Sequence, residues 1–248
     1  MVTATFRFHD ELNDFLAPKR RRQEFSVPCA QAATTKHMIE ALGVPHTEVA
    51  RILINGEPAG LDRPMQDGDR VAVYPRAQAM DATPPLGEAP LRRPGFVADA
   101  HLGGLARLLR MLGFDTLYDN HFHDDDIVSI CAHDGRIVLT RDRELLKRRA
   151  VTRGCYVHAL KSEAQLLEVV ARFDLARSVR PFTLCLHCNA PLRAADKAAV
   201  IDRLPPRVRE AHDRFSTCDA CGRVYWEGSH WCSMRRQLDA LLPADAGT

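Results

Sequence analysis

The sequence predicts an α/β protein in which a parallel sheet with helices on its faces follows a small α+β unit and precedes a cysteine-rich segment. Three observations lead to this prediction. Short apolar strands alternate with amphipathic helices over residues 94–180, which is typical of a parallel sheet. A proline-rich linker over residues 80–93 separates this region from residues 1–79. Two C-x-x-C pairs lie within residues 181–240.

The composition is that of a globular protein with no export or membrane segment. The chain has 248 residues, of which 46% are hydrophobic and 27% charged, and this length allows one to three domains. The first twelve residues contain charged side chains and no apolar run like that of a signal peptide. The sequence also contains no run of about 18 apolar residues, which a membrane span would require. We therefore expect a cytoplasmic protein. The formal net charge of +2 leaves the class of partner open.

Residues 1–79 are expected to form a compact α+β unit. Apolar and alternating stretches predict strands, and apolar side chains at helical spacing followed by Gly43 predict a helix. The turn signals Asn55-Gly56 and Asp67-Gly68-Asp69 separate the later strands. The strands are expected over residues 3–8, 51–54 and 71–74, and the helix over residues 35–42.

Residues 94–180 are expected to alternate between strand and helix. The apolar residues of the first helix share one face, and Gly113 follows it. Three acidic residues open the second helix, where negative charge favours the helix dipole. The strands are expected over residues 96–98, 116–118, 137–139 and 156–159, and the helices over residues 102–112, 124–132, 143–149 and 163–173.

Acidic residues follow the predicted strands at the positions where ligands bind in parallel sheets. Asp99, Asp119 and Asp142 each come after a strand, and Asp124 opens the second helix. Carboxylates gathered at one sheet edge repel one another unless a cation is bound, and Mg²⁺ or Mn²⁺ prefers such oxygen ligands. The alternative is that each Asp caps the helix that follows it.

The two cysteine pairs predict a structural zinc site. Cys185 and Cys188 form one C-x-x-C pair, and Cys218 and Cys221 form the other. A C-x-x-C turn brings two thiolates to one tetrahedral ion, and two such turns complete a closed set of four ligands without an open catalytic position. A redox pair is the alternative. The nearby histidines are rival ligands: His187, His212 and His230.

The central region resembles the Mut7-C ribonuclease domain, a branch of the PIN-like nucleases. The resemblance rests on FVAD at residues 96–99, on LGGLARLLRMLGFDT at residues 102–116 and on GRIVLTRD at residues 135–142. It implies a PIN-like α/β sandwich and divalent-metal-dependent cleavage of RNA. YWEGSHW at residues 225–231 resembles the segment after the second cysteine pair of the same family. Its aromatic residues are expected to pack around a zinc ribbon, with stacking on RNA bases as the alternative.

The same resemblance implies roles for individual residues. Asp99 and Asp142 match acidic positions of the family, and Asp124 is expected to be the third, with Asp125 as its rival. The remaining matches are basic residues that are expected to face phosphates, unless they are solvated surface residues: Arg107, Arg110 and Arg141.

The N-terminal unit resembles the Mut7-C ubiquitin-like domain. The resemblance is carried by ALGVPHTEV at residues 41–49 and DGDRVAVYP at residues 67–75, and it implies a β-grasp fold similar to small sulfur carriers. Such carriers act through a Gly-Gly end, whereas this unit continues through Arg76-Ala77-Gln78. We therefore expect a docking unit with a protein partner and no carrier chemistry, which can be deleted without unfolding the rest.

These observations predict a ribonuclease with a catalytic Mg²⁺ or Mn²⁺ ion and a structural zinc ion. Asp99, Asp124 and Asp142 are expected to hold the catalytic ion, with help from Asp119, while Arg141 neutralises phosphate charge. Arg107 and Arg110 are expected to bind RNA. The alternative is a non-catalytic RNA-binding or ribosome-associated protein, and a third possibility is an adaptor that acts through the β-grasp unit.

Overall fold

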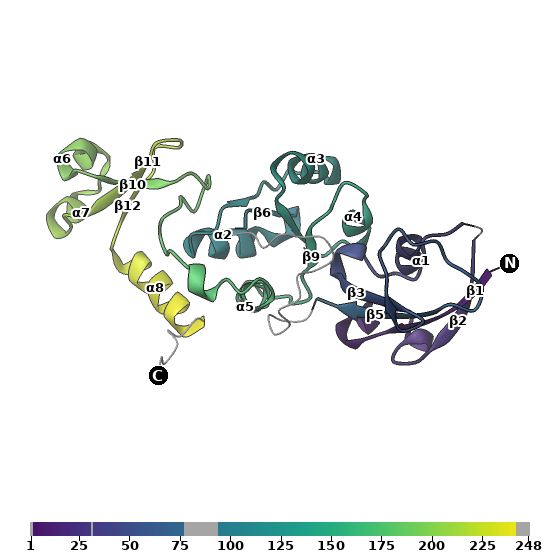
Figure 1. Cartoon of the computed structure of the whole chain (residues 1–248). Coiled ribbons are helices and arrows are strands. Elements are labelled where there is room, and N and C mark those ends of the chain that lie inside the picture. Colours follow the sequence, from purple (N-terminus) through teal and green to yellow (C-terminus); the bar gives the residue numbers. More distant parts are fainter. Residues whose placement is uncertain (1, 31, 77–93, 242–248) are drawn as a thin grey trace.

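The computed structural model describes residues 2–30, 32–76 and 94–241. Three units lie in a row along the long axis of the molecule (Figure 1): an N-terminal unit, a central unit and a C-terminal unit. None of the helices within the described ranges is long and apolar enough to cross a membrane.

The N-terminal unit is a β-grasp fold with a five-stranded sheet of order β2-β1-β5-β3-β4. β1 pairs in parallel with β5, and the other neighbouring strands are antiparallel. The predicted strands and helix are confirmed, but the prediction missed two edge strands that contain Pro28 and Pro58, since proline disrupts a strand pattern. The elements are β1 (Val2–Phe8), η1 (Asp10–Phe15), η2 (Pro18–Arg20), β2 (Phe25–Cys29), α1 (Thr35–Ala41), η3 (His46–Glu48), β3 (Val49–Ile54), β4 (Glu57–Pro58) and β5 (Arg70–Pro75).

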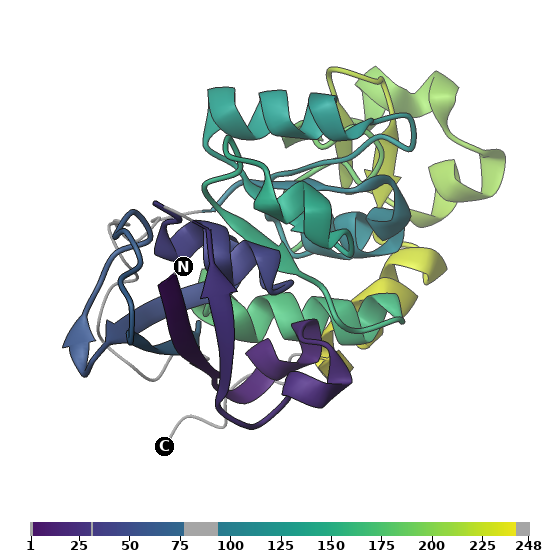
Figure 2. The same ribbon diagram turned by 90° about the vertical axis from the view of Figure 1, so that its right-hand side faces the viewer.

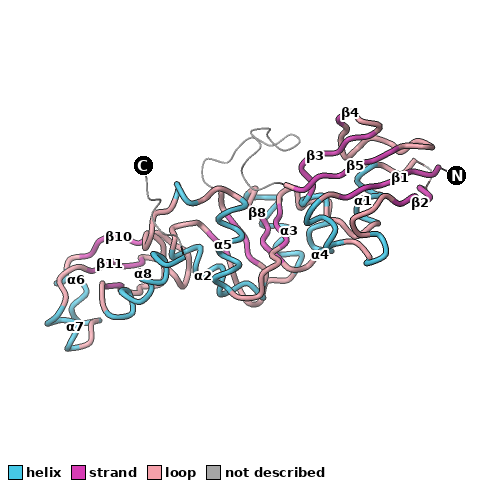
Figure 3. Tube along the Cα trace, turned by 90° about the horizontal axis from the view of Figure 1, so that it is seen from below, coloured by secondary structure: helices cyan, strands magenta, loops and turns pink. Residues whose placement is uncertain are grey.

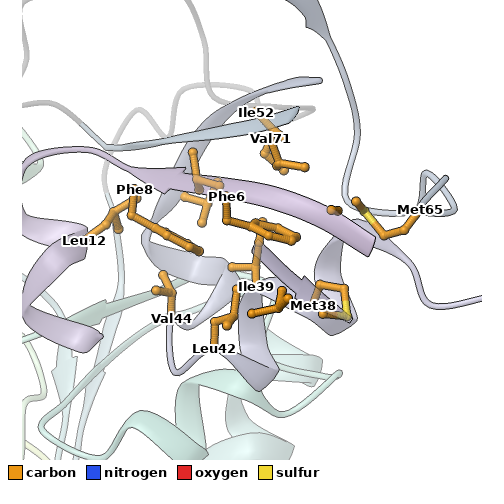
Figure 4. Close-up of a cluster of buried hydrophobic side chains, with 14 of the residues drawn as sticks. Phe6, Phe8, Leu12, Met38, Ile39, Leu42, Val44, Ile52, Met65 and Val71 are labelled. Carbon is orange, nitrogen blue, oxygen red and sulfur yellow. The ribbon is translucent and has the colours of Figure 1, made fainter. Parts of the chain in front are cut away.

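The core of this unit lies between the sheet and α1. Phe6 of β1 and Ile52 of β3 are fully buried, and Ile39 of α1 packs in the same cluster (Figure 4). The helix begins where the Thr34 side chain accepts a hydrogen bond of 3.2 Å from the His37 amide. The alternating pattern of β1 thus buries one face of the strand beneath the amphipathic helix.

A buried carboxylate fixes the turn before β5. Asp69 is 2% exposed and accepts hydrogen bonds from Asn55 Nδ2 at 3.0 Å, from the Gln66 amide at 2.8 Å and from Arg63 Nη2 at 3.2 Å. Burial alone would raise the pKa of Asp69, but these hydrogen bonds outweigh it and lower the pKa below its usual value. The turn is therefore stabilised by the ionised form of Asp69.

The central unit is a four-stranded parallel sheet of order β7-β6-β8-β9. The predicted alternation of strands and helices is confirmed. The fourth strand is predicted over residues 156–159 but spans Gly154–Tyr156, because these three residues are the ones that pair with β8. The elements are β6 (Phe96–Ala98), η4 (Ala100–Leu102), α2 (Gly103–Met111), β7 (Thr116–Leu117), α3 (Asp124–Asp134), β8 (Ile137–Thr140), α4 (Arg143–Lys147), β9 (Gly154–Tyr156) and α5 (Ser162–Arg172).

Both faces of this sheet are buried. Phe96 and Leu139 point toward α2 and α5, and Val97 and Val138 point toward α3 and α4. Figure 2 shows α3 (teal, top) and α5 (green, below) on opposite sides of the sheet. The strands are therefore apolar at every position, as expected for a doubly covered parallel sheet.

The C-terminal unit is a three-stranded antiparallel sheet of order β10-β11-β12. Its last helix, α8, runs back toward the central unit (Figure 3). Leu238 of α8 is buried in the same cluster as residues of α2 and α5. The sequence did not predict this return. The elements are η5 (Ala176–Ser178), β10 (Leu192–Ala195), α6 (Lys197–Val200), η6 (Ile201–Arg203), α7 (Pro206–Ala211), β11 (Phe215–Cys218), β12 (Val224–Trp226) and α8 (Ser229–Leu241).

The N-terminal and central units share a buried polar interface. Glu48, 1% exposed, pairs with Arg172 at 2.9 Å and accepts a hydrogen bond of 2.8 Å from the Tyr156 amide. The imidazole Nε2 of His46 lies 3.0 Å from the Val151 carbonyl oxygen. Deleting the N-terminal unit would leave Arg172 without its carboxylate, so the expectation of a freely removable unit is revised.

A second contact brings the β-grasp unit to the carboxyl end of the central sheet. Arg143 opens α4 and donates hydrogen bonds to the carbonyl oxygens of Phe15 at 3.2 Å and Asp14 at 3.3 Å. Its guanidinium also lies over the rings of Phe15 and Tyr156, at 4.9 and 5.5 Å from their centroids. Because Arg143 directly follows Asp142, the N-terminal unit borders the edge where the acidic residues lie.

Candidate active site and metal centre

The four cysteines of the C-x-x-C pairs meet at one point. Their sulfur atoms all lie within 4.8 Å of one another, with Cys185 and Cys221 3.6 Å apart and Cys188 and Cys218 3.4 Å apart. These distances are far above the length of a disulfide, about 2.05 Å. Tetrahedral zinc with Zn–S bonds of about 2.3 Å requires sulfur atoms about 3.8 Å apart. The set can therefore hold such an ion with little adjustment.

The two cysteine turns have the same local structure. The amide of Asn189 donates to the Cys185 carbonyl oxygen at 2.9 Å, and the amide of Gly222 donates to the Cys218 carbonyl oxygen at 2.8 Å. Asn189 and Gly222 have φ values of 67° and 72°, in the left-handed region that these two residue types tolerate. The expected turn conformation is confirmed in both pairs.

Hydrogen bonds favour the ionised form of one of these cysteines, and the thiolate is the form that binds a cation. The Tyr225 hydroxyl lies 3.0 Å from Cys185 Sγ. Burial opposes ionisation, but hydrogen bonds from the Cys188 amide, the Tyr225 hydroxyl and the His187 amide lower the pKa of Cys185 to about 6. The rival histidines are not part of the ligand set that the described residues form.

Two of the predicted acidic residues flank the switch point of the central sheet. Asp99 follows β6 directly, and Asp142 lies two residues beyond the end of β8, its parallel neighbour. From β6 the chain passes to β7 on one side of the sheet, whereas β8 leads to β9 on the other. Open α/β sheets bind ligands outside the carboxyl ends of the strands at this reversal.

A threonine that the sequence analysis missed joins these two residues. Thr140 is fully buried at the end of β8; its hydroxyl donates to Asp99 Oδ2 at 2.6 Å and accepts from the Asp142 amide at 2.9 Å. The signal in the sequence is a polar residue that ends an otherwise apolar strand. Thr140 thus fixes the Asp99 carboxylate relative to the main chain at Asp142.

Asp142 caps α4 and keeps one oxygen available. Its Oδ1 accepts hydrogen bonds from the Glu144 amide at 2.7 Å and the Leu145 amide at 3.4 Å, so the capping alternative is correct as far as Oδ1 is concerned. No hydrogen-bond partner of Asp142 Oδ2 or Asp99 Oδ1 lies in the part of the chain that the structure describes. Both carboxylates can therefore offer an oxygen to a ligand.

The other acidic residues are engaged elsewhere. Asp119 accepts hydrogen bonds from the amide and ring Nδ1 of His121, at 2.9 and 3.0 Å, and these bonds lower its pKa. Asp124 lies 3.7 Å from Arg148, which also pairs with Asp125. Within residues 2–30, 32–76 and 94–241, the four cysteines form the one group of three or more possible metal ligands whose donor atoms lie close enough together to share an ion. The expected convergence of Asp99, Asp124 and Asp142 is therefore not present in this geometry.

The three arginines predicted to face phosphates lie in different environments. Arg141 donates to the carbonyl oxygens of Ala159 at 2.6 Å and His158 at 3.2 Å, beyond β9 at the same sheet edge. Arg107 is exposed on α2, and its Nη2 lies 3.3 Å from His230 Nε2. Arg110 is a different case.

Arg110 is structural, which corrects the prediction that it binds RNA. It is 5% exposed and donates to the carbonyl oxygens of Thr116 at 2.9 Å, His187 at 2.8 Å and Leu186 at 3.3 Å. Its guanidinium therefore ties α2 to the first cysteine turn. The helical pattern could not show that this position faces the C-terminal unit.

A parallel sheet with acidic residues at its switch point, joined to a β-grasp unit and a four-cysteine unit, defines an α/β protein with a candidate ligand site at the sheet edge and a candidate metal centre. The Mut7-C RNAse domain model matches residues 94–238, and the Mut7-C ubiquitin model matches residues 1–81. The chain therefore belongs to the Mut7-C RNAse family, as its sequence resemblance predicted. No curated protein matches it.

Among solved structures, two crystal structures of small archaeal modifier protein 1 from Haloferax volcanii are similar to part of the chain. One is 20% identical and covers 30% of this chain and 98% of its own, with a TM-score of 0.25. The other is also 20% identical and covers 29% of this chain and 93% of its own, with a TM-score of 0.24.

Proposed function

We propose that the chain is a divalent-metal-dependent ribonuclease that hydrolyses RNA phosphodiester bonds at the sheet edge between β6 and β8. The observation that carries the proposal is the linkage of Asp99 to the main chain at Asp142 through the buried Thr140 hydroxyl, at 2.6 and 2.9 Å. This arrangement lies at the switch point of a domain that belongs to a ribonuclease family.

The residues at this edge suit Mg²⁺ or Mn²⁺. Mg²⁺ usually keeps several waters and takes one or two carboxylates from the protein, so a complete triad is not required. Asp99 and Asp142 supply hard oxygen donors of this kind. When bound, the ion would polarise a phosphate oxygen and lower the pKa of an attacking water.

Residues of the chain itself would position the two carboxylates and bind the RNA phosphate. Thr140 fixes one oxygen of the Asp99 carboxylate, and the α4 cap holds one oxygen of Asp142. Arg141 is anchored on the loop after β9 and would offer its remaining N–H groups to a phosphate. Asp124 would join this site only after its pair with Arg148 opens, while Asp119 would act at the periphery.

We further propose that the cysteine set holds zinc in a structural role. Four thiol ligands close the coordination sphere, so no position remains for substrate. Arg110 connects one cysteine turn to α2, and a metal that stabilises this turn would therefore also stabilise the central domain. The C-terminal unit would then be a zinc ribbon.

The alternative function is a non-catalytic RNA-binding or ribosome-associated protein. The observation that favours it is that Asp124 forms an ion pair with Arg148. Asp124 does not lie close enough to Asp99 and Asp142 for the three carboxylates to share an ion. In that case the basic and aromatic surfaces would act without cleavage. The β-grasp domain, whose interface with the central domain includes Glu48, would still present its remaining surface to a protein partner.

The direct test is cleavage of a mixed RNA pool by the full zinc-loaded protein, with and without Mn²⁺. The proposal predicts products that accumulate only when Mn²⁺ or Mg²⁺ is present, because phosphodiester hydrolysis at two carboxylates requires the cation. Equal product with and without the cation would contradict the metal-dependent mechanism. RNA binding without cleavage under every condition would favour the alternative.

A further inference from the structure

A groove lies between the C-terminal sheet, α8 and Arg107 on the exposed side of α2, and it borders the first cysteine turn at Leu186 and His187. Its volume is about 1210 Å³, above the roughly 300–1,000 Å³ of small-molecule pockets. Figure 1 shows α8 leaving the end of β12 and running back toward α5, so that β12 and α8 form two of its walls. We call this cavity the aromatic groove.

The groove carries both tryptophans of the chain, Trp226 and Trp231. Both are only partly buried, so each ring packs on the protein and still presents surface to the groove. Trp231 lies 5.0 Å from the ring of Phe182 at an angle of 38°. The φ of Phe182 is 58°, which is unfavourable for a bulky residue, and its amide donates a hydrogen bond of 2.9 Å to the Met111 carbonyl oxygen at the end of α2.

The charges that line the groove are mainly basic. Arg214 and Arg223 have no carboxylate within ion-pair distance among the described residues. Arg107 reaches the groove from α2 and contacts His230. Of the two acidic residues that line the groove, Asp213 pairs with Lys197 at 2.8 Å, whereas Glu227 is exposed and has no cation within ion-pair distance among the described residues. One free carboxylate is thus outnumbered by the arginines. An anionic ligand would therefore meet uncompensated guanidinium groups.

We propose that the aromatic groove binds single-stranded RNA, with bases stacked on Trp226 and Trp231 and phosphates on Arg107, Arg214 and Arg223. Aromatic platforms beside basic residues recognise unpaired strands because every base offers a stacking face. A duplex keeps its bases stacked inside and cannot use these rings. The aromatic residues thus serve both the packing of the small sheet and the binding of bases.

This inference rests on the proposed function in one respect only, namely that the RNA bound in the groove is then cleaved. Arg107 lies in the second turn of α2, and α2 begins four residues after Asp99. A strand in the groove would therefore follow the outer side of the helix that leads to the acidic edge. The groove gives the substrate class of the nuclease as single-stranded RNA and excludes a duplex.

The two tryptophans make the test direct. Intrinsic fluorescence of the full zinc-loaded protein is titrated, without Mg²⁺ or Mn²⁺, with single-stranded RNA of about 12 nucleotides, a length within the 4–16 nucleotides typical of one binding module. Saturable quenching is expected, and the same sequence as a duplex should bind much more weakly. Trp231→Ala should weaken binding by about fivefold to 150-fold, the effect of losing one stacked base.

Matched arginine variants separate groove contacts from general charge. Arg223→Ala should reduce the slope of log affinity against log salt by about 0.7, since one phosphate contact on a single strand is lost. Arg207→Ala removes an exposed arginine of α7 outside the groove and should leave both the affinity and the slope unchanged. Zinc content and circular dichroism are measured for each variant, and Arg223 is exposed, so its loss does not disturb packing.

Three results would overturn the inference: no quenching by RNA, equal affinity for duplex RNA, or tight binding of poly-glutamate instead of RNA. The outcome is distinguishable from that of the proposed function. Groove binding without Mn²⁺-dependent cleavage would leave the inference intact and refute the nuclease. Cleavage with a KM that neither Trp231→Ala nor Arg223→Ala changes would refute the groove and leave the nuclease.

Discussion

The buried ion pair between the β-grasp unit and the central unit provides a quantitative prediction. Glu48→Gln removes the negative charge opposite Arg172 but keeps an oxygen that can accept from the Tyr156 amide. The side chains of Glu48 and Arg172 are only 1% and 12% exposed, so water cannot take the place of the carboxylate. Arg172 would remain as a buried and unpaired cation.

The expected loss of stability is about 3 kcal/mol, at the lower end of the range of about 3–5 kcal/mol for breaking a buried pair, because one hydrogen bond is retained. For a chain of this size, each kcal/mol shifts the melting temperature by about 2–4 °C, so the expected decrease is about 6–12 °C. Replacing both partners, as Glu48→Gln with Arg172→Met, should recover much of this loss because no buried charge remains.

The assay is thermal unfolding followed by circular dichroism, with Glu144→Gln as the control. Glu144 pairs with Lys147 at 2.7 Å, but its side chain is 78% exposed, so its loss should cost less than about 1 kcal/mol. If Glu48→Gln melts within a degree or two of Glu144→Gln, the domains are not held together by this pair. The β-grasp unit would then be the separable module that the linker suggests.

Four further predictions concern other parts of the molecule. Cys218→Ser should release zinc, measured by metal analysis, and loosen residues 182–236 in hydrogen exchange. Arg110→Met should destabilise the protein by about 1–3 kcal/mol, measured by urea unfolding, because buried carbonyl groups lose their donor. Thr140→Val should lower kcat and also destabilise the protein by about 1–3 kcal/mol in urea unfolding, because the partly buried Asp142 amide and Asp99 Oδ2 lose their partner. The pKa of Asp69 is lowered in the folded protein. The free energy of unfolding, measured with urea, should therefore be larger for the parent than for Asp69→Asn at pH 7. This difference should disappear as the pH falls below about 3.9 and through the folded-state pKa.

Local patterns account for what the sequence predicted correctly. The cysteine set depends on short spacing within two turns, and each turn carries its own signal in Asn189 or Gly222. The parallel sheet follows from apolar strands that alternate with helices. Asp99 and Asp142 could be placed at one edge because each comes within two residues of the end of a strand, and parallel strands end on the same side.

What the sequence could not predict depends on contacts between distant segments. Arg110 occupies a position on α2 that looks like a surface position until the first cysteine turn covers it. Asp124 pairs with Arg148 and therefore does not join Asp99 and Asp142. No sequence pattern relates Asp124 to Arg148. The pairing of Glu48 with Arg172 crosses two domains, and a buried charge of this kind has no local signal.

The central claim is that Asp142 acts at a catalytic cation and does not only cap α4. The most direct measurement compares the rates of Mn²⁺-dependent RNA cleavage by Asp142→Asn and Asp126→Asn proteins. Asn caps helices about as well as Asp, and Asp126 accepts a hydrogen bond of 2.9 Å from the His123 amide at the start of α3. We expect both proteins to remain folded, with cleavage abolished in Asp142→Asn and unchanged in Asp126→Asn. An Asp142→Asn protein that cleaves RNA as fast as the parent would contradict the account.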